Sequence, residues 1–301
     1  MIPPRSRTPS RRKVARPDEG VLFPLNRRAT IKLVRTALDE DGAFNDITTI
    51  ATVVSDRRAQ CRLVARQAGV IAGLPLGVEV FRQVNPRVVI RVDGEDGRLV
   101  EAGSVFAVLS GRARGLLSAE RVALNFLQRL SGIASLAAKF VAAVEGTGAQ
   151  IFDTRKTTPG WRSLEKYAVR AGGGMNHRMD LSSAILIKDN HLRALDGDLE
   201  LAIRRTRDLA PRGTPVEVEC DRLNQVKGAL AAGADVIMLD NMKVDEIRRC
   251  VELVDGRARL EASGGVTLAN IRAIAKTGVD RISVGALTHS APALDLALDF
   301  T

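Results

Sequence analysis

DTRKTTPGWRSLEKYAVRAGGGMNHRMDLSSAILIKDNH, residues 153–191, is the most informative stretch of this chain. Its two ends, Asp-Thr-Arg-Lys and Lys-Asp-Asn-His, each follow a short apolar segment that is typical of a strand, and a helical pattern lies between them. The order strand–helix–strand predicts parallel strands joined by a crossover helix. The stretch also holds five potential cations that together indicate an anion-binding site: Arg155, Lys156, His177, Arg178 and Lys188.

The same alternation continues from this stretch to the end of the chain. Strands are predicted at 150–153, 184–188, 216–219, 236–240, 259–262 and 281–284, with helices near 162–171, 198–210, 222–232, 243–254 and 267–277. About six such units predict an α/β barrel or a doubly wound sheet. No GxGxxG follows the first strand, which disfavours a dinucleotide-binding sheet.

Polar residues at the ends of the predicted strands favour the barrel, because such ends converge on one mouth. Glu219 and Asp240 end two strands, and these carboxylates are suited to hold Mg²⁺ through water or to accept hydrogen bonds from sugar hydroxyls. Glu217 shares the alternating face of Glu219, so register alone does not show that Glu219 points inward. The last two strands lead into small-residue loops that predict a phosphate site, Ser263-Gly264-Gly265 and Gly285-Ala286.

The first half of the chain predicts a separate α+β domain. Residues 24–40 have helical spacing, and residues 51–109 read as strands joined by turns. Residues 116–145 predict one long helix or two consecutive helices, with Gly132 as a weak point. Arg121 and Asn125 share one face of this helix, and from spacing alone an exposed arginine is the simplest interpretation.

Composition restricts the classes of function. Of the net charge of +10, six charges lie before Asp18, so the body is only mildly basic, and 3% aromatic residues argue against a base-stacking surface. The tail is predicted to be a disordered, solvated extension rather than a transit peptide, although its basic character leaves nucleic-acid binding as a rival hypothesis. No apolar run is long enough to cross a bilayer. Three isolated cysteines fit a reducing compartment, and we expect a cytoplasmic protein.

Several motifs together resemble the quinolinate phosphoribosyltransferase family. They are ERVALNFLQRLSGIAS, DTRKTTPGWRSLEKYAVRAGGGMNHR, LIKDNH, VEVE, VIMLDN, EASGGV and SVGALTHS, preceded by NDITT and ARQAGVIAGLPLGVEVF. The resemblance runs from about Leu33 to the C-terminus. The basic tail, at 1–20, is not part of the family pattern. The resemblance implies an α+β sandwich domain at 21–130, an incomplete α/β barrel of about six strands at 131–287, and a C-terminal helix at 288–301 that returns towards the N-terminal domain.

The resemblance also implies a reaction: quinolinate and phosphoribosyl pyrophosphate give nicotinate mononucleotide, pyrophosphate and CO₂ with Mg²⁺, in de novo NAD biosynthesis. It implies a homodimer, or a higher oligomer, in which Arg121 reaches the site of the neighbouring subunit. Quinolinate and pyrophosphate would be bound by Thr154, Arg155, Lys156, His177, Arg178 and Lys188. Glu219 and Asp240 would bind ribose and Mg²⁺, Ser263, Gly264, Gly265, Gly285 and Ala286 would hold the 5′-phosphate, and the catalytic set would be Lys156, Lys188, Glu219 and Asp240.

One local departure concerns the loop after Arg178. Many family members have Gly at the place of Asp180 and Asp at the place of Ser183, so the resemblance predicts every cation here but not the geometry of this loop. Two further hypotheses have related chemistry: a phosphoribosyltransferase for a mono-acid such as nicotinate, which would release no CO₂, and a paralogous group that is associated with molybdenum transport and has a different acceptor.

Overall fold

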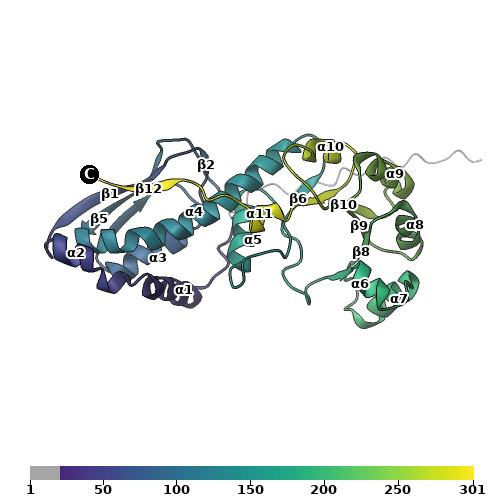
Figure 1. Cartoon of the computed structure of the whole chain (residues 1–301), viewed down its shortest axis with the longest axis horizontal. Coiled ribbons are helices and arrows are strands. Elements are labelled where there is room, and N and C mark those ends of the chain that lie inside the picture. The colour runs from purple at the N-terminus through teal and green to yellow at the C-terminus, as the bar shows by residue number, and fades with distance from the viewer. Residues whose placement is uncertain (1–20) are drawn as a thin grey trace, which may run out of the picture.

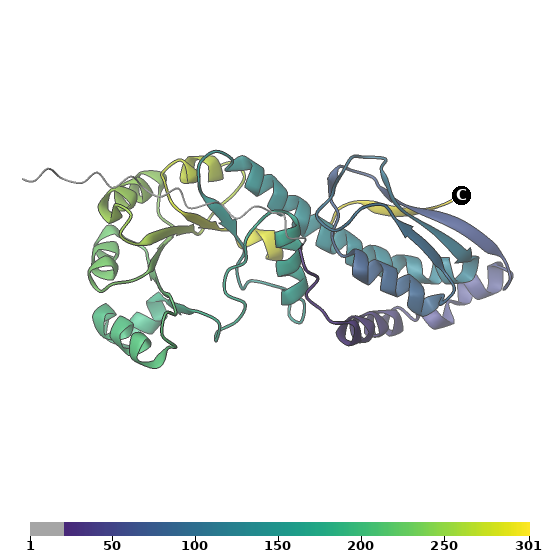
Figure 2. The ribbon, with the colours of Figure 1, turned by 180° about the vertical axis from the view of Figure 1, so that it is seen from behind.

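The structure, a computed structural model, describes residues 21–301, so the predicted basic tail lies outside the described residues. The chain forms an N-terminal sandwich and a C-terminal barrel-like domain, which lie end to end in Figures 1 and 2. Within the described part of the chain, no helix is both long and apolar enough to cross a membrane.

The N-terminal domain is a four-stranded antiparallel sheet with helices packed on one face. Its strands are β1 (Arg58–Ala65), β5 (Val105–Arg112), β3 (Val89–Val92) and the C-terminal β12 (Leu296–Phe300), in the order β12-β1-β5-β3. The helices are α1 (Arg27–Glu40), α2 (Ile47–Thr52) and α3 (Leu74–Val84), and the short β2 (Gly69–Val70) and β4 (Leu99–Val100) form a separate ribbon. Asn26 and Asp46 cap α1 and α2 by accepting backbone N–H bonds, so both helices begin at side chains suited to that position.

A single helix, α4 (Ala113–Ala143), connects the two domains. It packs against α3 and the sheet at its start and against α5 (Arg162–Ala171) further along. It does not break at Gly132. A Cβ at this glycine would lie 2.0 Å from the carbonyl oxygen of Pro292, so the glycine permits close approach of the C-terminal segment rather than marking a helix boundary.

The second domain has six parallel strands, which confirms the predicted α/β barrel-like fold. The strands are β6 (Gln150–Phe152), β7 (Ile185–Ile187), β8 (Val216–Cys220), β9 (Val236–Asp240), β10 (Arg259–Ser263) and β11 (Arg281–Ser283). Between them lie α6 (Asp189–Arg193), α7 (Leu199–Leu209), α8 (Leu223–Ala231), α9 (Val244–Val254) and α10 (Ile271–Ala275), and Figure 1 shows α8, α9 and α10 on the outer side of the curved sheet. Apolar runs such as Val236–Leu239 are fully buried, as expected for strands covered on both faces.

The barrel is incomplete because its two edge strands, β6 and β7, are not paired with each other. The segment that connects α5 to β7 partly covers the opening. Met175 forms an isolated parallel bridge with Phe152 at the end of β6, and this places the following residues, His177 and Arg178, inside the sheet curvature.

The C-terminal segment corrects one prediction. Residues 288–301 do not form a helix: α11 (Ala286–His289) is a single short turn, and β12 follows it and pairs antiparallel with β1. Leu296 and Leu298 are buried while Ala297 and Asp299 are half-buried, so the pattern has the period of two that a strand requires. The segment does return to the N-terminal domain, as a strand of its sheet.

Candidate active site

The C-terminal ends of the barrel strands bring together a cation and two carboxylates. Lys188 follows β7, and its ammonium forms an ion pair with the carboxylate of Glu219 near the end of β8. Asp240 ends β9 in register with Ser263 at the end of β10. Asp240 is half-buried and accepts a hydrogen bond of 2.8 Å from the amide of Asn241. Three successive strands therefore carry polar groups to the same edge of the sheet, as their position after apolar runs predicts.

The two glycine-rich loops lie at this edge too. Gly264 and Gly265 have φ of +87° and +59°, a backbone region that favours glycine. A Cβ at Gly264 would lie 2.2 Å from Oδ1 of Asn241, so the loop after β10 packs tightly against the end of β9. The absence of side chains leaves backbone N–H groups accessible to an anion.

Lys156 is placed beside the second glycine loop. A Cβ at Gly285 would lie 3.3 Å from Cδ of Lys156, and the backbone carbonyl of Lys156 accepts a hydrogen bond of 2.8 Å from the Thr288 hydroxyl. Thr154 shapes the same loop, because its hydroxyl accepts a bond of 3.1 Å from the N–H of Lys156. The cation and a phosphate-type loop thus share one location although they are about 130 residues apart in the chain.

A buried carboxylate ties the two cation-bearing segments together. Asp153, immediately after β6, accepts hydrogen bonds from the ammonium of Lys166, the amide of Asn176 and the backbone N–H of His177. The Lys166 ammonium also donates to the carbonyl of His177 at 2.9 Å. Burial raises the pKa of Asp153 and lowers that of Lys166, while their mutual attraction opposes both shifts. The pair therefore fixes the position of Arg155 relative to His177.

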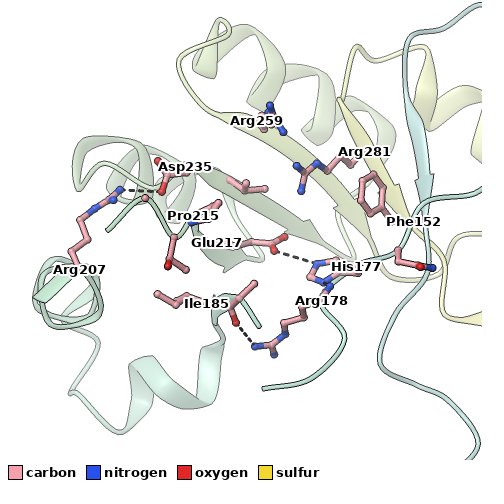
Figure 3. A pocket seen from close by; sticks show the side chains of 15 residues that line it. Phe152, His177, Arg178, Ile185, Arg207, Pro215, Glu217, Asp235, Arg259 and Arg281 are labelled. Atoms are coloured by element: carbon pink, nitrogen blue, oxygen red, sulfur yellow. Dashed lines mark hydrogen bonds and ion pairs between the residues drawn. The ribbon is translucent and has the colours of Figure 1, made fainter. Parts of the chain in front are cut away.

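His177 lies between two buried glutamates inside the barrel. Its Nε2 is 3.2 Å from Oε2 of Glu217 and 3.4 Å from Oε1 of Glu261 (Figure 3 shows the first contact). Burial alone would lower the pKa of His177, but the two carboxylates raise it to about 9. Its Nδ1 accepts a bond of 2.8 Å from the N–H of Arg178, so a second ring proton would have to displace this bond.

Glu261 is a residue that the sequence did not single out. It shares the alternating face of Arg259 and Ser263 on β10, which is the only signal in the sequence. Glu217 points inward as well as Glu219, which resolves the register question for β8. Within the described residues, His177, Glu217 and Glu261 form the one group of three side chains close enough together to hold a metal ion. However, a metal on Nε2 would require the proton on Nδ1, where Arg178 already donates.

The remaining predicted cations differ in their placement. Arg178 is half-buried and donates to the carbonyl of Ala184 at 3.1 Å, and burial together with the nearby charge of Arg155 lowers its pKa. Arg155 is half-buried, with its Nε shielded from solvent and without a partner. Arg121 is exposed on α4 and, among residues 21–301, makes no ion pair within 4 Å. The fold therefore gathers the barrel cations without including Arg121.

Comparison with known proteins places this chain and its fold in one class of phosphoribosyltransferases. Models of the quinolinate phosphoribosyl transferase N-terminal and C-terminal domains match residues 46–131 and 133–299. The chain belongs to the quinolinate phosphoribosyltransferase family.

Similarity to individual proteins supports the assignment to this family. The chain is 46% identical over 274 residues to the nicotinate-nucleotide pyrophosphorylase [carboxylating] of Mycobacterium leprae, covering 88% of this chain and 95% of the relative. It is 43% identical over 270 residues to a probable enzyme of the same name from Bacillus subtilis, covering 90% and 93%. The solved nicotinate-nucleotide pyrophosphorylase of Francisella tularensis superposes with a TM-score of 0.86 at 38% identity and covers 93% of this chain and 99% of that one. Nothing in these comparisons supports the molybdenum-associated alternative.

Proposed function

We propose that this chain transfers the phosphoribosyl group of phosphoribosyl pyrophosphate to quinolinate and removes CO₂, giving nicotinate mononucleotide and pyrophosphate in de novo NAD biosynthesis. The observation that carries the proposal is the proximity of Lys156 to the Gly285 loop and of Lys188 to Glu219 at one edge of the barrel. Such a site offers positive charge for a pyrophosphate, acceptors for sugar hydroxyls and backbone donors for a phosphate. Family membership and the names of the relatives support the same reaction.

Each group has a role in this reaction. Lys156 would neutralise the leaving pyrophosphate, and Arg155 and Arg178 would bind the quinolinate carboxylates, with guanidinium groups that pair with carboxylates in a bidentate manner. Glu219 and Asp240 would accept hydrogen bonds from the ribose hydroxyls. The two glycine loops would hold the 5′-phosphate. Thr154, His177 and Lys188 complete the predicted binding set, His177 with both ring nitrogens already directed at protein groups.

The reaction proceeds in two steps. The quinolinate nitrogen forms a bond to the anomeric carbon while the bond to pyrophosphate breaks, and the protein stabilises this step through position and charge. The bond between the ring and the adjacent carboxylate then breaks. Its electron pair remains on the ring carbon beside the positively charged nitrogen, CO₂ leaves, and the carbon takes up a proton. No base is needed for the attack, because the nitrogen already carries a lone pair.

Mg²⁺ is the cofactor we propose. The side chains of Glu219 and Asp240 are chemically suited to bind Mg²⁺, because carboxylate oxygens are preferred Mg²⁺ ligands. Both groups lie at the edge of the sheet where the pyrophosphate would bind. When bound, the ion would neutralise charge on the leaving group. Lys188 already pairs with Glu219, so direct coordination by this residue would compete with the lysine.

We further propose that the working unit is a homodimer, or a higher oligomer, with a shared site. Arg121 is exposed on α4 and, within residues 21–301, forms no ion pair within 4 Å. Its guanidinium is therefore available to bind a ligand in a neighbouring subunit. The location we propose is the cytoplasm. The three cysteines are buried and unpaired, as is usual in reducing compartments.

The experiment that tests the reaction supplies quinolinate and phosphoribosyl pyrophosphate with Mg²⁺ to the purified chain. We expect nicotinate mononucleotide and CO₂ in equal amounts, and loss of both when Mg²⁺ is chelated. Nicotinate in place of quinolinate separates the mono-acid hypothesis, because turnover of nicotinate would yield the nucleotide without CO₂. Absence of product from quinolinate in a folded sample would refute the proposal.

A further inference from the structure

A large cavity opens at the end of the barrel opposite the candidate active site. Its volume is about 550 Å³, and it is lined by the first residues of four strands and by Pro215, which immediately precedes a fifth. The four residues are Ile185 of β7, Val236 of β9, Arg259 of β10 and Arg281 of β11. The proposed reaction uses the other ends of these strands, as is general for α/β barrels. The cavity therefore opens at a different end of the barrel, although His177 and Arg178 of the proposed quinolinate set also line its wall.

Four guanidinium groups face this cavity, and two acids offset part of their charge (Figure 3). Arg207 is paired with Asp235 at 3.2 Å, and Glu217 is directed at His177. Arg178 donates to a backbone carbonyl and is already assigned to quinolinate, so Arg259 and Arg281 are the guanidinium groups that this end of the barrel offers to a second ligand.

Arg259 and Arg281 are the most informative of these residues. Within residues 21–301, Arg259 makes no ion pair within 4 Å and is exposed. Arg281 is mostly buried, and its nearest carboxylate oxygen, Oε2 of Glu261, is 3.8 Å away, which is too long for a hydrogen bond. Its guanidinium lies 4.9 Å from the centre of the Phe152 ring. Like charges at one opening repel each other, so a bound anion would stabilise the arrangement.

The rest of the wall combines polar residues, Asn176, His177 and Thr214, with an apolar part. Phe152, Ile185, Pro215 and Val236 offer contact to a ring, and the cavity volume lies within the usual range for small-ligand sites of about 300–1,000 Å³. A phosphate monoester carries a charge of about −1.5 to −2 near neutral pH, which matches several guanidinium groups better than a monocarboxylate does. We propose that this cavity binds a phosphate monoester attached to a ring, of the size of a mononucleotide.

Binding of adenosine monophosphate, measured by titration calorimetry in the absence of the substrates, tests the proposal. Arg259→Ala and Arg281→Gln should each weaken its binding by about tenfold or more, because each removes a charged hydrogen-bond donor. Adenosine, which lacks the phosphate, should not bind detectably. Arg249→Ala, an exposed arginine on the outer helix α9, should leave the affinity unchanged.

Two further measurements distinguish ligand binding in this cavity from ligand binding in the active site. Lys156→Ala should retain the Arg259-dependent binding, and Arg259→Ala should retain the turnover of quinolinate in the absence of the nucleotide. The proposal is wrong if the parent chain does not bind adenosine monophosphate, or if binding is lost in Lys156→Ala but is unchanged in both arginine variants. The proposed reaction is judged by turnover alone, so either proposal can fail without the other.

Discussion

Asp153 and Lys166 form an ion pair whose two side chains are completely buried. The pair lies between the segment that carries Arg155 and Lys156 and the segment that carries His177. Removal of one partner from a buried pair leaves an uncompensated charge. The pair therefore links the stability of the barrel to the geometry of its cations.

Asp153→Asn should lower the free energy of unfolding by about 3–5 kcal/mol, because Lys166 would remain buried without a counter-charge. Urea unfolding followed by circular dichroism measures this change. The control is Asp245→Asn: Asp245 pairs with Arg248 at 2.7 Å but is 81% exposed, so its loss should cost less than about 1 kcal/mol. Similar small effects for both variants would contradict the structural role assigned to the pair.

Lys156→Ala and Lys188→Ala should each reduce the turnover number by about 10²–10³-fold, since each removes a charge directed at developing negative charge in the site. Steady-state rates with quinolinate and phosphoribosyl pyrophosphate measure the loss. Arg193→Ala is the matched control, because Arg193 is 77% exposed and, among residues 21–301, its one ion pair is with Asp189 next to the site. Near-normal turnover in both lysine variants would rule out the assignment of the site.

Gly132→Ala should destabilise the protein by about 1–3 kcal/mol, because the new methyl group would meet the carbonyl of Pro292 and displace the segment that leads to β12. Gly228→Ala is the comparison: this glycine lies in α8, is exposed, and its Cβ would be 3.5 Å from Leu199, an ordinary contact. That change should stabilise the helix by up to about 1 kcal/mol. Thermal unfolding of the two variants distinguishes a packing effect from helix propensity, and a stabilised Gly132→Ala would contradict the close approach.

Glu261→Gln should lower the pKa of His177 from about 9 towards its ordinary value of 6.5, because one of the two carboxylates beside Nε2 loses its charge. A raised pKa contributes stability that is fully present below pH 6.5 and is lost as pH rises through about 9. The variant should therefore lose part of this stability at neutral pH. NMR titration measures the pKa, with His177→Asn to assign the signal among three histidines. An unchanged pKa would show that Glu261 does not govern the ring.

The sequence was sufficient to predict the six strands and the groups at their ends. Short apolar runs followed by polar residues mark parallel strands independently of distant contacts, so the sequence alone places Glu219, Asp240 and the glycine loops at strand ends. Contacts between distant segments were not predictable. Lys166 lies in an amphipathic helix where a lysine usually faces solvent, and only the position of Asp153 beneath it explains its burial.

The C-terminal segment was misassigned for a similar reason. A short apolar run such as Leu296–Phe300 fits a helix or a strand, and its partner β1 lies more than 200 residues earlier. Glu261 was missed because its alternation with Arg259 and Ser263 does not reveal what lies opposite it. The contact with His177 arises from the curvature of the sheet, which no local pattern encodes.

Mixing Arg121→Ala with Lys156→Ala subunits tests the shared site. If Arg121 acts in the neighbouring subunit, each single variant has strongly reduced activity. A mixed dimer contains one site with both residues intact, so random mixing of equal amounts should restore about a quarter of the parent activity. Native mass spectrometry must show that mixed dimers form. Arg249→Ala mixed with Lys156→Ala is the control mixture, because Arg121 is intact in both of its subunits. Mixed dimers with no more activity than either variant alone would show that Arg121 does not act across an interface.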